Sequence, residues 1–415
     1  MGSTQSKHWV LLAAGAKGWD DYRHQACVCH AYQVARRNGI PDEQIVVMMY
    51  DDIAYNQENR YQGQIINVPN GPNVYQGVPK DYTGDDVSAK NFLAILRGDE
   101  AGVDKQTRGP KRVLNSGQND TVFVYLSGHG GPGLFAFPTE DLHAFDLVDT
   151  VKKMSTRQQF SKMVIYVESC FSGSMIHHLP KNAQVYGVSA ATPDEPSYAC
   201  FFDEDRCTCL SNEFSSQWLL HLKMHDLNCT TFQNQFDYLK TNVRLSTPCQ
   251  YGNNELSRLF ISNILGCPDS RTLAASISRA ERVSPTHLTP SHNVTLIIKE
   301  NRIRREKDLD KKRALQRDYH KLLQTRSRFE KAVSDIAKHS CPRRGPRALS
   351  ERRSLTRLED MKKVAEHFRL TFSEWHEEQD DCCVLQHMHI FVSLIESGVD
   401  VARIKAAITH VRLHS

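Results

Sequence analysis

The first 265 residues alternate apolar runs of strand length with stretches of helical spacing, and this alternation limits the possible folds of the chain more than any other feature. The strands expected from the apolar runs are 8–15, 44–50, 121–127, 162–167, 183–191 and 259–265. Apolar residues at intervals of three and four predict helices at 24–38, 88–97 and 146–158. Strands that alternate with helices in this way predict an α/β domain around a mostly parallel sheet.

The pattern changes beyond residue 265. Residues 266–300 hold three prolines among scattered polar residues, which indicates a linker or activation segment. From residue 301 onward, Lys, Arg and Glu alternate with apolar residues at helical spacing. The helices expected there are 309–338, 355–375, 384–396 and 399–413. The sequence therefore predicts three parts, which are an α/β domain over 1–265, a linker over 266–300 and a small helical bundle over 301–415.

Charge divides along the same boundary. Residues 301–415 carry 25 Lys and Arg against 17 Asp and Glu, whereas residues 1–300 carry 27 against 31. A basic tail is typical of proteins that bind nucleic acid or anionic membranes, but it can also dock on its own acidic body. A third interpretation is two solvated surfaces that never meet. Because Trp375 is the tail's only tryptophan and aromatic residues are not interleaved with its charges, we expect no nucleic-acid partner.

Membrane insertion is not expected, because the longest apolar runs, 122–126 and 163–167, are far shorter than the ~18 residues of a spanning helix. The 12 cysteines do not settle the compartment, and their spacing fits no zinc site, so no metal or cofactor is expected. The chain shows no secretory signal at its start, where Gly2 and Ser6 fit an N-myristoylation pattern. Three sequons favour secretion instead, at Asn119, Asn228 and Asn293.

Two of the expected strands run directly into chemically distinctive turns. Strand 121–127 is followed by His129 in a glycine-rich turn, and strand 162–167 is followed by Cys170. Singly, a loop histidine and a small buried cysteine would explain these residues. If the two strands are neighbours, both side chains lie at one sheet edge, where an imidazole can accept the thiol proton. The backbone N–H of Gly130 and that of Cys170 could then hold an oxyanion, which predicts a Cys/His hydrolase.

At these residues the chain resembles legumain, the asparaginyl endopeptidase family of the caspase-like cysteine peptidases. The motifs that carry the resemblance include Tyr22-Arg-His-Gln-Ala, Phe137-Pro-Thr-Glu-Asp-Leu-His143, Ser172-Gly-Ser-Met175, His178-Leu-Pro180 and Ser197-Tyr-Ala-Cys200. The helical tail is similar to the family's C-terminal prodomain, including His367-Phe-Arg369. The resemblance covers nearly the whole chain.

The resemblance implies an α/β sandwich around a six-stranded sheet, with His129 as base and Cys170 as nucleophile. It implies cleavage of proteins and peptides after Asn, and after Asp at lower pH. It also implies a zymogen whose helical prodomain is a partner of the body until self-cleavage in an acidic compartment, with Asn301 or Asn293 as the cleaved residue. The resemblance also implies a lysosomal, endolysosomal or secreted location, whereas the visible N-terminus favours a cytoplasmic alternative. Cystatin-type inhibitors are possible partners by the same resemblance.

An asparagine side chain offers one acceptor and one donor group, so its pocket needs a donor such as Arg and an acceptor such as a carboxylate. By resemblance these are Arg23 and Glu168, with Ser197 on the wall, although an ordinary Arg–Glu ion pair is the alternative interpretation. Legumains usually have Asp where this chain has Asn212. They commonly have Asn where it has Asp21, which could still accept a hydrogen bond from His129.

Further departures lie close to the site or in the tail. Gly128 replaces a common Asp before the histidine, and Phe171 replaces a Glu after the nucleophile. Of the expected half-cystines in the tail only Cys341 matches, since the other positions hold Phe372, Ile395 and Arg412. These departures motivate an alternative function, a catalytically weakened relative that acts through binding or inhibition.

Overall fold

The computed structural model describes the chain except for residues 1–5, 269–270, 272–282, 374–380 and 415. The acylation pattern at Gly2 and the tryptophan Trp375 therefore lie outside the described residues. Among the described residues, no helix combines the length and apolar character needed to cross a membrane.

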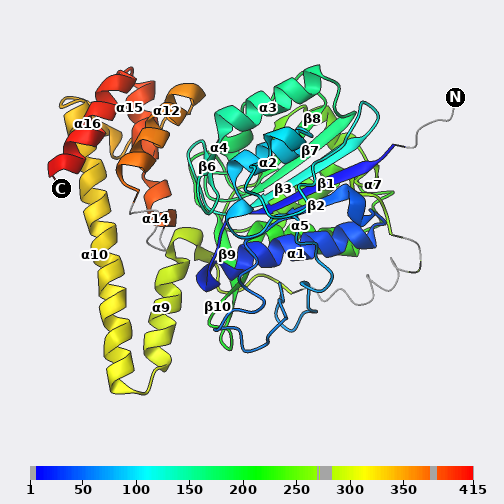
Figure 1. Cartoon of the computed structure of the whole chain (residues 1–415), viewed down its shortest axis with the longest axis horizontal. Helices are drawn as coiled ribbons and strands as arrows, with labels where there is room; N and C mark the ends of the chain where they lie inside the picture. The colour runs from blue at the N-terminus through cyan, green and yellow to red at the C-terminus, as the bar shows by residue number, and fades with distance from the viewer. Residues whose placement is uncertain (1–5, 269–270, 272–282, 374–380, 415) are drawn as a thin grey trace.

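A six-stranded sheet forms the centre of the body, which confirms the expected fold class (Figure 1). Its order is β11 (Cys249–Gly252), β8 (Val185–Ser189), β7 (Lys162–Glu168), β3 (Thr121–Ser127), β1 (His8–Ala14) and β2 (Ile45–Met48). Neighbouring strands are parallel except for β11, which runs antiparallel to β8. The four central strands are almost entirely buried, which explains why they read as continuous apolar runs.

Helices cover both faces of this sheet. One face packs against α1 (Tyr22–Arg37), α5 (Glu213–Met224), α6 (Phe232–Asn242) and α7 (Ser262–Leu265). The other packs against α2 (Ala89–Leu96), α3 (Ala144–Thr156) and α4 (Gly173–Ile176). Alternate residues of each strand enter the two cores, as Phe123 and Val124 of β3 do. The body is therefore a three-layer sandwich, with its strand ends left to build a site.

Two small antiparallel sheets extend the carboxyl edge. One joins β4 (Gly130–Gly131), β5 (Leu134–Ala136) and β6 (Asp141–His143). The other joins β9 (Tyr198–Asp203), β10 (Thr208–Asn212) and the later β12 (Thr289–Pro290). The second sheet thus pairs the body with the segment that precedes the helical region.

The helical region lies at one end of the body (Figure 1). A hairpin of α9 (Val294–Arg305) and the long α10 (Leu309–Ser340) leads into a bundle. The bundle comprises α11 (Gly345–Ala348), α12 (Leu358–Thr371), α14 (Asp381–Gln386), α15 (His389–Glu396) and α16 (Val401–His414). Its core contains Phe372 and Ile395, two positions where half-cystines were expected.

Three expected elements differ from the structure. The predicted strand over 259–265 is wrong, because Ile261, Ile264 and Leu265 bury at helical spacing and the segment ends in α7. The sixth strand is β11 instead, a half-buried edge strand whose Cys-Gln-Tyr-Gly sequence carries no apolar run. The helix predicted over 384–396 is split into α14 and α15. Helix α9 begins at Val294, within the segment predicted to be a linker.

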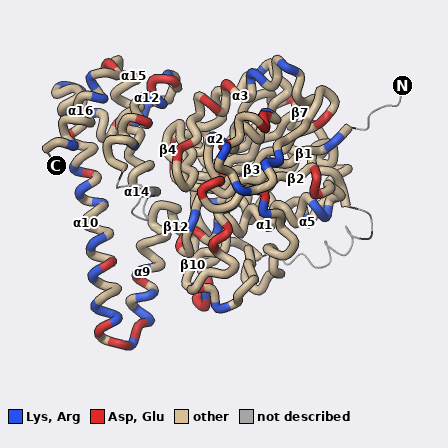
Figure 2. The backbone as a smooth tube through the Cα atoms, in the orientation of Figure 1, with Lys and Arg blue, Asp and Glu red and all other residues tan. Residues whose placement is uncertain are grey.

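Ion pairs join the basic helical region to the acidic body, and opposite charges approach each other along this contact (Figure 2). Lys362 Nζ lies 2.7 Å from Asp146, and Arg369 lies 2.5 Å from Asp141. Arg302 of α9 contacts both Asp20 at 3.1 Å and Glu58 at 2.5 Å. The two oppositely charged parts therefore contact each other. The alternative interpretation, in which both charged surfaces are solvated and never meet, does not hold.

Apolar contacts accompany these ion pairs. Leu134 and Ala136 of β5 belong to the same buried cluster as the core of the helical bundle. Leu355, which precedes α12, packs so closely on Gly133 that an added Cβ would lie 2.7 Å from its side chain. The carbonyl of Leu355 also accepts hydrogen bonds from the Nε2 atoms of His177 at 3.0 Å and His178 at 2.8 Å. We call the whole contact between body and helical region the seam.

Candidate active site

The ends of β3 and β7 bring His129 and Cys170 to one edge of the sheet. In the parallel register Ser127 lies opposite Glu168, and the N–H of Gly128 donates to the carbonyl of Glu168 at 3.0 Å. His129 and Cys170 each follow these paired positions by two residues. The expectation that the two strands are neighbours is therefore confirmed, and it is the register that places the imidazole and the thiol at the same edge.

His129 is held by a carboxylate that in turn is held by a buried arginine. His129 Nε2 lies 2.8 Å from Asp21 Oδ2, and the other carboxylate oxygen accepts from Arg23 at 2.9 Å. Burial alone would raise the pKa of Asp21, but the neighbouring His129 and Arg23 outweigh it and hold that pKa below its usual range. Asp21 is thus an anion whose carboxylate contacts the imidazole of His129.

Cys170 lies in a buried turn beneath Ser197. The N–H of Ser197 donates to Cys170 Sγ at 3.3 Å, and burial raises the pKa of the thiol above its usual value. The next residue, Phe171, has a φ of 56°, a left-handed conformation that bulky side chains rarely adopt. Ser174 fixes this turn, since its hydroxyl donates to the Phe171 carbonyl at 2.6 Å and accepts from the N–H of Gly133 at 2.7 Å. These two hydrogen bonds hold the turn after Cys170 in its sharp conformation.

Two glycines beside His129 are required by close packing. A Cβ on Gly130 would lie 2.5 Å from the Cys170 carbonyl, so this position allows the two turns to approach. A Cβ on Gly128 would lie 2.7 Å from the ring of Phe135. The aromatic ring therefore occupies the space where the resemblance implied an aspartate side chain.

The residues expected to recognise the substrate side chain gather behind this edge. Arg23 Nε donates to Asn212 Oδ1 at 3.1 Å, and all atoms of Arg23 are buried. Glu168 accepts from the N–H and hydroxyl of Ser215 at 3.1 and 2.9 Å, and burial raises its pKa to about 7. The arrangement offers fixed donors and a carboxylate at one place, which suits an amide side chain.

The segment before α9 and helix α14 lie over this edge. The hydroxyl of Ser291 lies 3.3 Å from that of Ser197, next to the thiol. A Cβ on Gly131 would lie 2.6 Å from the carbonyl of Leu385, so α14 packs directly on β4. In the state described here, the cysteine, the histidine and the recognition residues are accordingly all buried.

The structure also shows where the candidate cleavage and glycosylation residues lie. Asn301 is inside α9, where its amide donates to the carbonyl of Ile297 at 2.9 Å. Asn293 directly precedes α9 and accepts from Arg326 at 3.4 Å. Of the three sequons, Asn119 and Asn228 are exposed, whereas Asn293 is half-buried.

Sequence reasoning did not single out three residues of the site. His24 packs edge-on against His129 with ring centroids 5.0 Å apart, Ser215 holds Glu168, and Ser291 contacts Ser197. The available signal was the place of His24 in the Tyr22-Arg-His-Gln-Ala motif, directly after Arg23. Ser215 and Ser291 depend on tertiary contacts that no local pattern encodes.

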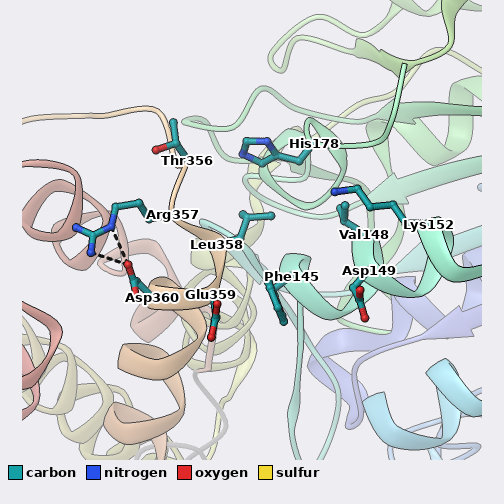
Figure 3. Close-up of a pocket in the computed structure, with 10 residues that line it drawn as sticks. All are labelled: Phe145, Val148, Asp149, Lys152, His178, Thr356, Arg357, Leu358, Glu359 and Asp360. Carbon is teal, nitrogen blue, oxygen red and sulfur yellow. Dashed lines mark hydrogen bonds and ion pairs between the residues drawn. The ribbon is translucent and has the colours of Figure 1, made fainter. Parts of the chain in front are cut away.

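A cavity of about 480 Å³ opens elsewhere, between α3 and the start of α12 (Figure 3). Figure 3 shows His178 and Lys152 on the body side and the Arg357–Asp360 ion pair on the helical side. The cavity lies along the seam and contains neither His129 nor Cys170. It marks a place where body and helical region are incompletely packed.

Comparisons with known proteins agree with this geometry. Residues 8–267 match the model of the Peptidase C13 family. Legumain from Homo sapiens is 42% identical over 409 residues, covering 98% of this chain and 93% of that protein. The vacuolar-processing enzyme delta-isozyme of Arabidopsis thaliana is 36% identical, with 81% and 75% covered. Hemoglobinase from Schistosoma japonicum is 39% identical, with 74% and 71% covered. The chain belongs to the Peptidase C13 family of cysteine peptidases.

Proposed function

We propose that this protein is a cysteine endopeptidase that cleaves after asparagine, and after aspartate at lower pH, and that its helical region keeps it inactive until acidification. The observation that carries the proposal is the pairing of β3 with β7, which places His129 and Cys170 at one sheet edge. The hydrogen-bonded chain from Arg23 through Asp21 to His129 supports it, because it connects the recognition residue to the base.

Each group has a role in peptide cleavage. Cys170 transfers its proton to His129 and attacks the carbonyl carbon, while the N–H groups of Gly130 and Cys170 stabilise the oxyanion. His129 then gives the proton to the leaving amine, which departs and leaves a thioester on Cys170. Water, deprotonated by His129, hydrolyses the thioester and restores the thiol. Asp21 keeps the imidazole in the orientation that both proton transfers need.

Recognition follows from the groups behind the thiol. Arg23 donates to the side-chain carbonyl of a substrate asparagine, and Glu168 accepts from its amide. Because the pKa of Glu168 is raised to about 7, this carboxyl is neutral in acid, where it no longer repels a substrate aspartate. Asn212 adds no negative charge beside Arg23. Acceptance of aspartate in acid is therefore built into the same residues.

Buried histidines along the seam favour opening in acid. Burial lowers the pKa values of His143 and His177 on the body, which contact Glu366 and Leu355 of the helical region. When the seam opens, these side chains regain ordinary values near 6.5, so the open state binds more protons as the pH falls below that value. Acid therefore favours release of the helical region, after which the hidden thiol becomes accessible.

An acidic compartment such as the lysosome, and self-cleavage at Asn301 or Asn293, fit this behaviour. Both asparagines lie between the body and the long helix α10. A cut at either residue would separate the helical region from the body. The two exposed sequons at Asn119 and Asn228 are accessible for glycosylation along a secretory route.

The test is hydrolysis by the full-length protein at pH 4–5 of fluorogenic peptides that end in Asn, Asp or Ala. We expect cleavage after Asn, weaker cleavage after Asp and none after Ala. Cys170→Ala should abolish activity, whereas Cys229→Ala, which changes an exposed free thiol, should not. Asn212→Asp should lower the Asp/Asn ratio of kcat/KM about tenfold, through repulsion by the added carboxylate. A folded protein that stays inactive even after an added protease removes the helical region would overturn the proposal in favour of a binding or inhibitory role.

A further inference from the structure

Three metal-ligating side chains converge at the sheet edge. Asp21, His24 and His129 each have one ligand atom within 4.8 Å of the others. Asp21 and His24 flank Arg23 at the start of α1, and His129 comes from the turn after β3. Among the described residues this is the one group of three or more histidine, cysteine or acidic side chains with such proximity.

The mechanism above does not use His24. Its Nδ1 lies 3.0 Å from the hydroxyl of Ser127, while Nε2 is buried with no hydrogen-bond partner among the described residues. A buried imidazole nitrogen without a partner costs free energy unless something else satisfies it. Neutral imidazole is the form of histidine that binds metal ions.

The donor set selects the kind of ion. Two imidazole nitrogens and one carboxylate oxygen suit zinc and its neighbours among the first-row transition metals, and not calcium or magnesium. Zinc bonds of ~2.0–2.1 Å place adjacent ligand atoms about 3.3 Å apart in a tetrahedron. His129 Nε2 and Asp21 Oδ2 are 2.8 Å apart, and the ligand atoms of all three residues lie within 4.8 Å of one another.

We propose that Asp21, His24 and His129 form an inhibitory site for a zinc-like divalent cation. An ion bound there would either coordinate the nitrogen through which His129 transfers protons or hold the ring out of the orientation that this transfer needs. In both cases it would block the peptidase reversibly. This consequence rests on the proposed function, whereas the binding itself does not. The side chain of Asp21 is 22% exposed, whereas His24 and His129 are buried.

The same surroundings set the strength of the site. The guanidinium of Arg23 lies 2.9 Å from the carboxylate of Asp21, and its charge opposes a second cation. Binding should therefore be weaker than at a structural zinc site, and the ion should exchange with solution. A site of this kind regulates by metal concentration and does not stabilise the fold.

Metal binding is tested on the full-length Cys170→Ala protein, which separates it from thiol chemistry and from peptidase activity. Titration with Co²⁺ should give the visible absorption of a low-symmetry site, and Zn²⁺ should displace that absorption in a one-to-one ratio. Asp21→Asn and His24→Gln should each weaken binding at least about tenfold. His30→Gln is the matched control, because His30 is also buried on α1 with an unpartnered Nε2 but belongs to no such group.

Surface histidines of the helical region could bind metal as well, so Co²⁺ binding by each variant is compared with that of the Cys170→Ala parent, and complete loss of binding is not required. Equal Co²⁺ spectra and affinities in Cys170→Ala alone and with Asp21→Asn or His24→Gln would overturn the proposal. In the active protein, the Zn²⁺ concentration for half inhibition should rise about tenfold or more in the His24→Gln variant. If no peptidase activity exists, the Co²⁺ result still decides the metal site, and only the proposed function fails.

Discussion

Arg23 contacts a carboxylate on one side and an amide on the other. Its NH1 group donates to Asp21 and its Nε to Asn212. The resemblance to legumains implies the opposite placement, with the amide beside the histidine and the carboxylate in the pocket. Arg23 therefore still contacts one negatively charged side chain, but in this protein that carboxylate, Asp21, lies against His129. The neighbouring Glu213 does not replace the pocket carboxylate, since it accepts from the N–H of Arg244 at 2.9 Å.

Glu168 makes the body more stable in acid than in base. Its pKa is about 7 in the folded protein and about 4.5 when unfolded, so between these values the folded state holds the extra proton. Stability should therefore fall as the pH rises through this window, by about 3 kcal/mol in total. Glu168→Gln removes the titration and keeps an acceptor for Ser215. We expect the unfolding midpoint of Glu168→Gln to rise relative to the parent between pH 4.5 and pH 8.

This comparison is made in the Cys170→Ala background, so that self-cleavage does not interfere. Contributions from all other titrating groups cancel when the unfolding midpoint of one protein is subtracted from that of the other at the same pH. A constant difference across the pH range would show that Glu168 does not titrate in this window.

At the scale of elements, the sequence predicted the strands that carry the chemistry better than the segments that cover it. Strand β3 was predicted at its observed bounds, because a run buried on both faces needs no partner to be recognised. Edge strand β11 and the two-residue β12 were missed, since their pairing depends on distant residues. The pairing of His129 with Asp21 was accessible only through resemblance, because the two residues are 108 positions apart.

The turn after α4 contacts the helical region through two adjacent histidines. His177 and His178 both donate to the Leu355 carbonyl, and their rings lie 3.8 Å apart. Burial and the neighbouring His178 lower the pKa of His177, so its protonation below pH 6.5 favours the open seam. His177→Gln keeps a donor but does not titrate. We expect this variant to release the helical region at a pH lower by a few tenths of a unit.

Release can be followed by limited proteolysis of the Cys170→Ala protein across pH 4–7. His320→Gln, which changes an exposed histidine of α10, is the control and should match the parent. If His177→Gln opened at a higher pH than the parent, the attachment would depend on the imidazole's packing and not on its titration.

At the scale of the whole molecule, the division of charge read from the sequence becomes a physical contact. Lys362 pairs with Asp146 across the seam, and Arg302 pairs with Asp20 and Glu58. These side chains are partly exposed, so salt screens their attraction, while the apolar contacts of Leu355 remain. We therefore expect release of the helical region at a higher pH in 0.5 M than in 0.05 M NaCl, about tenfold apart in ionic strength.

The control for the salt experiment is Lys362→Met, which removes the ion pair with Asp146 across the seam and the one with Glu366 within α12, and keeps an apolar stem. Its shift between the two salt concentrations should be smaller than that of the parent. Equal release curves of the parent in both salts would mean that packing alone holds the seam.

The helical region also holds together through packing where disulfides were expected. Phe372 is buried in the core of the bundle, and the guanidinium of Arg412 lies 5.6 Å from the centre of its ring. Cys341 is a free thiol. Reducing agents should therefore leave these contacts unchanged.

Asn301 lies within a formed helix, and peptidases bind their substrates as extended chain. Its carbonyl and amide groups become available only when α9 unwinds, which also breaks the contacts of Arg302 with the body. Maturation at this residue would thus proceed in a fixed order, first unwinding and then scission. The slow step, the unwinding of α9, would take place within each molecule independently of the others. Adding more mature enzyme would therefore speed up scission and leave the lag before it, which unwinding sets, unchanged.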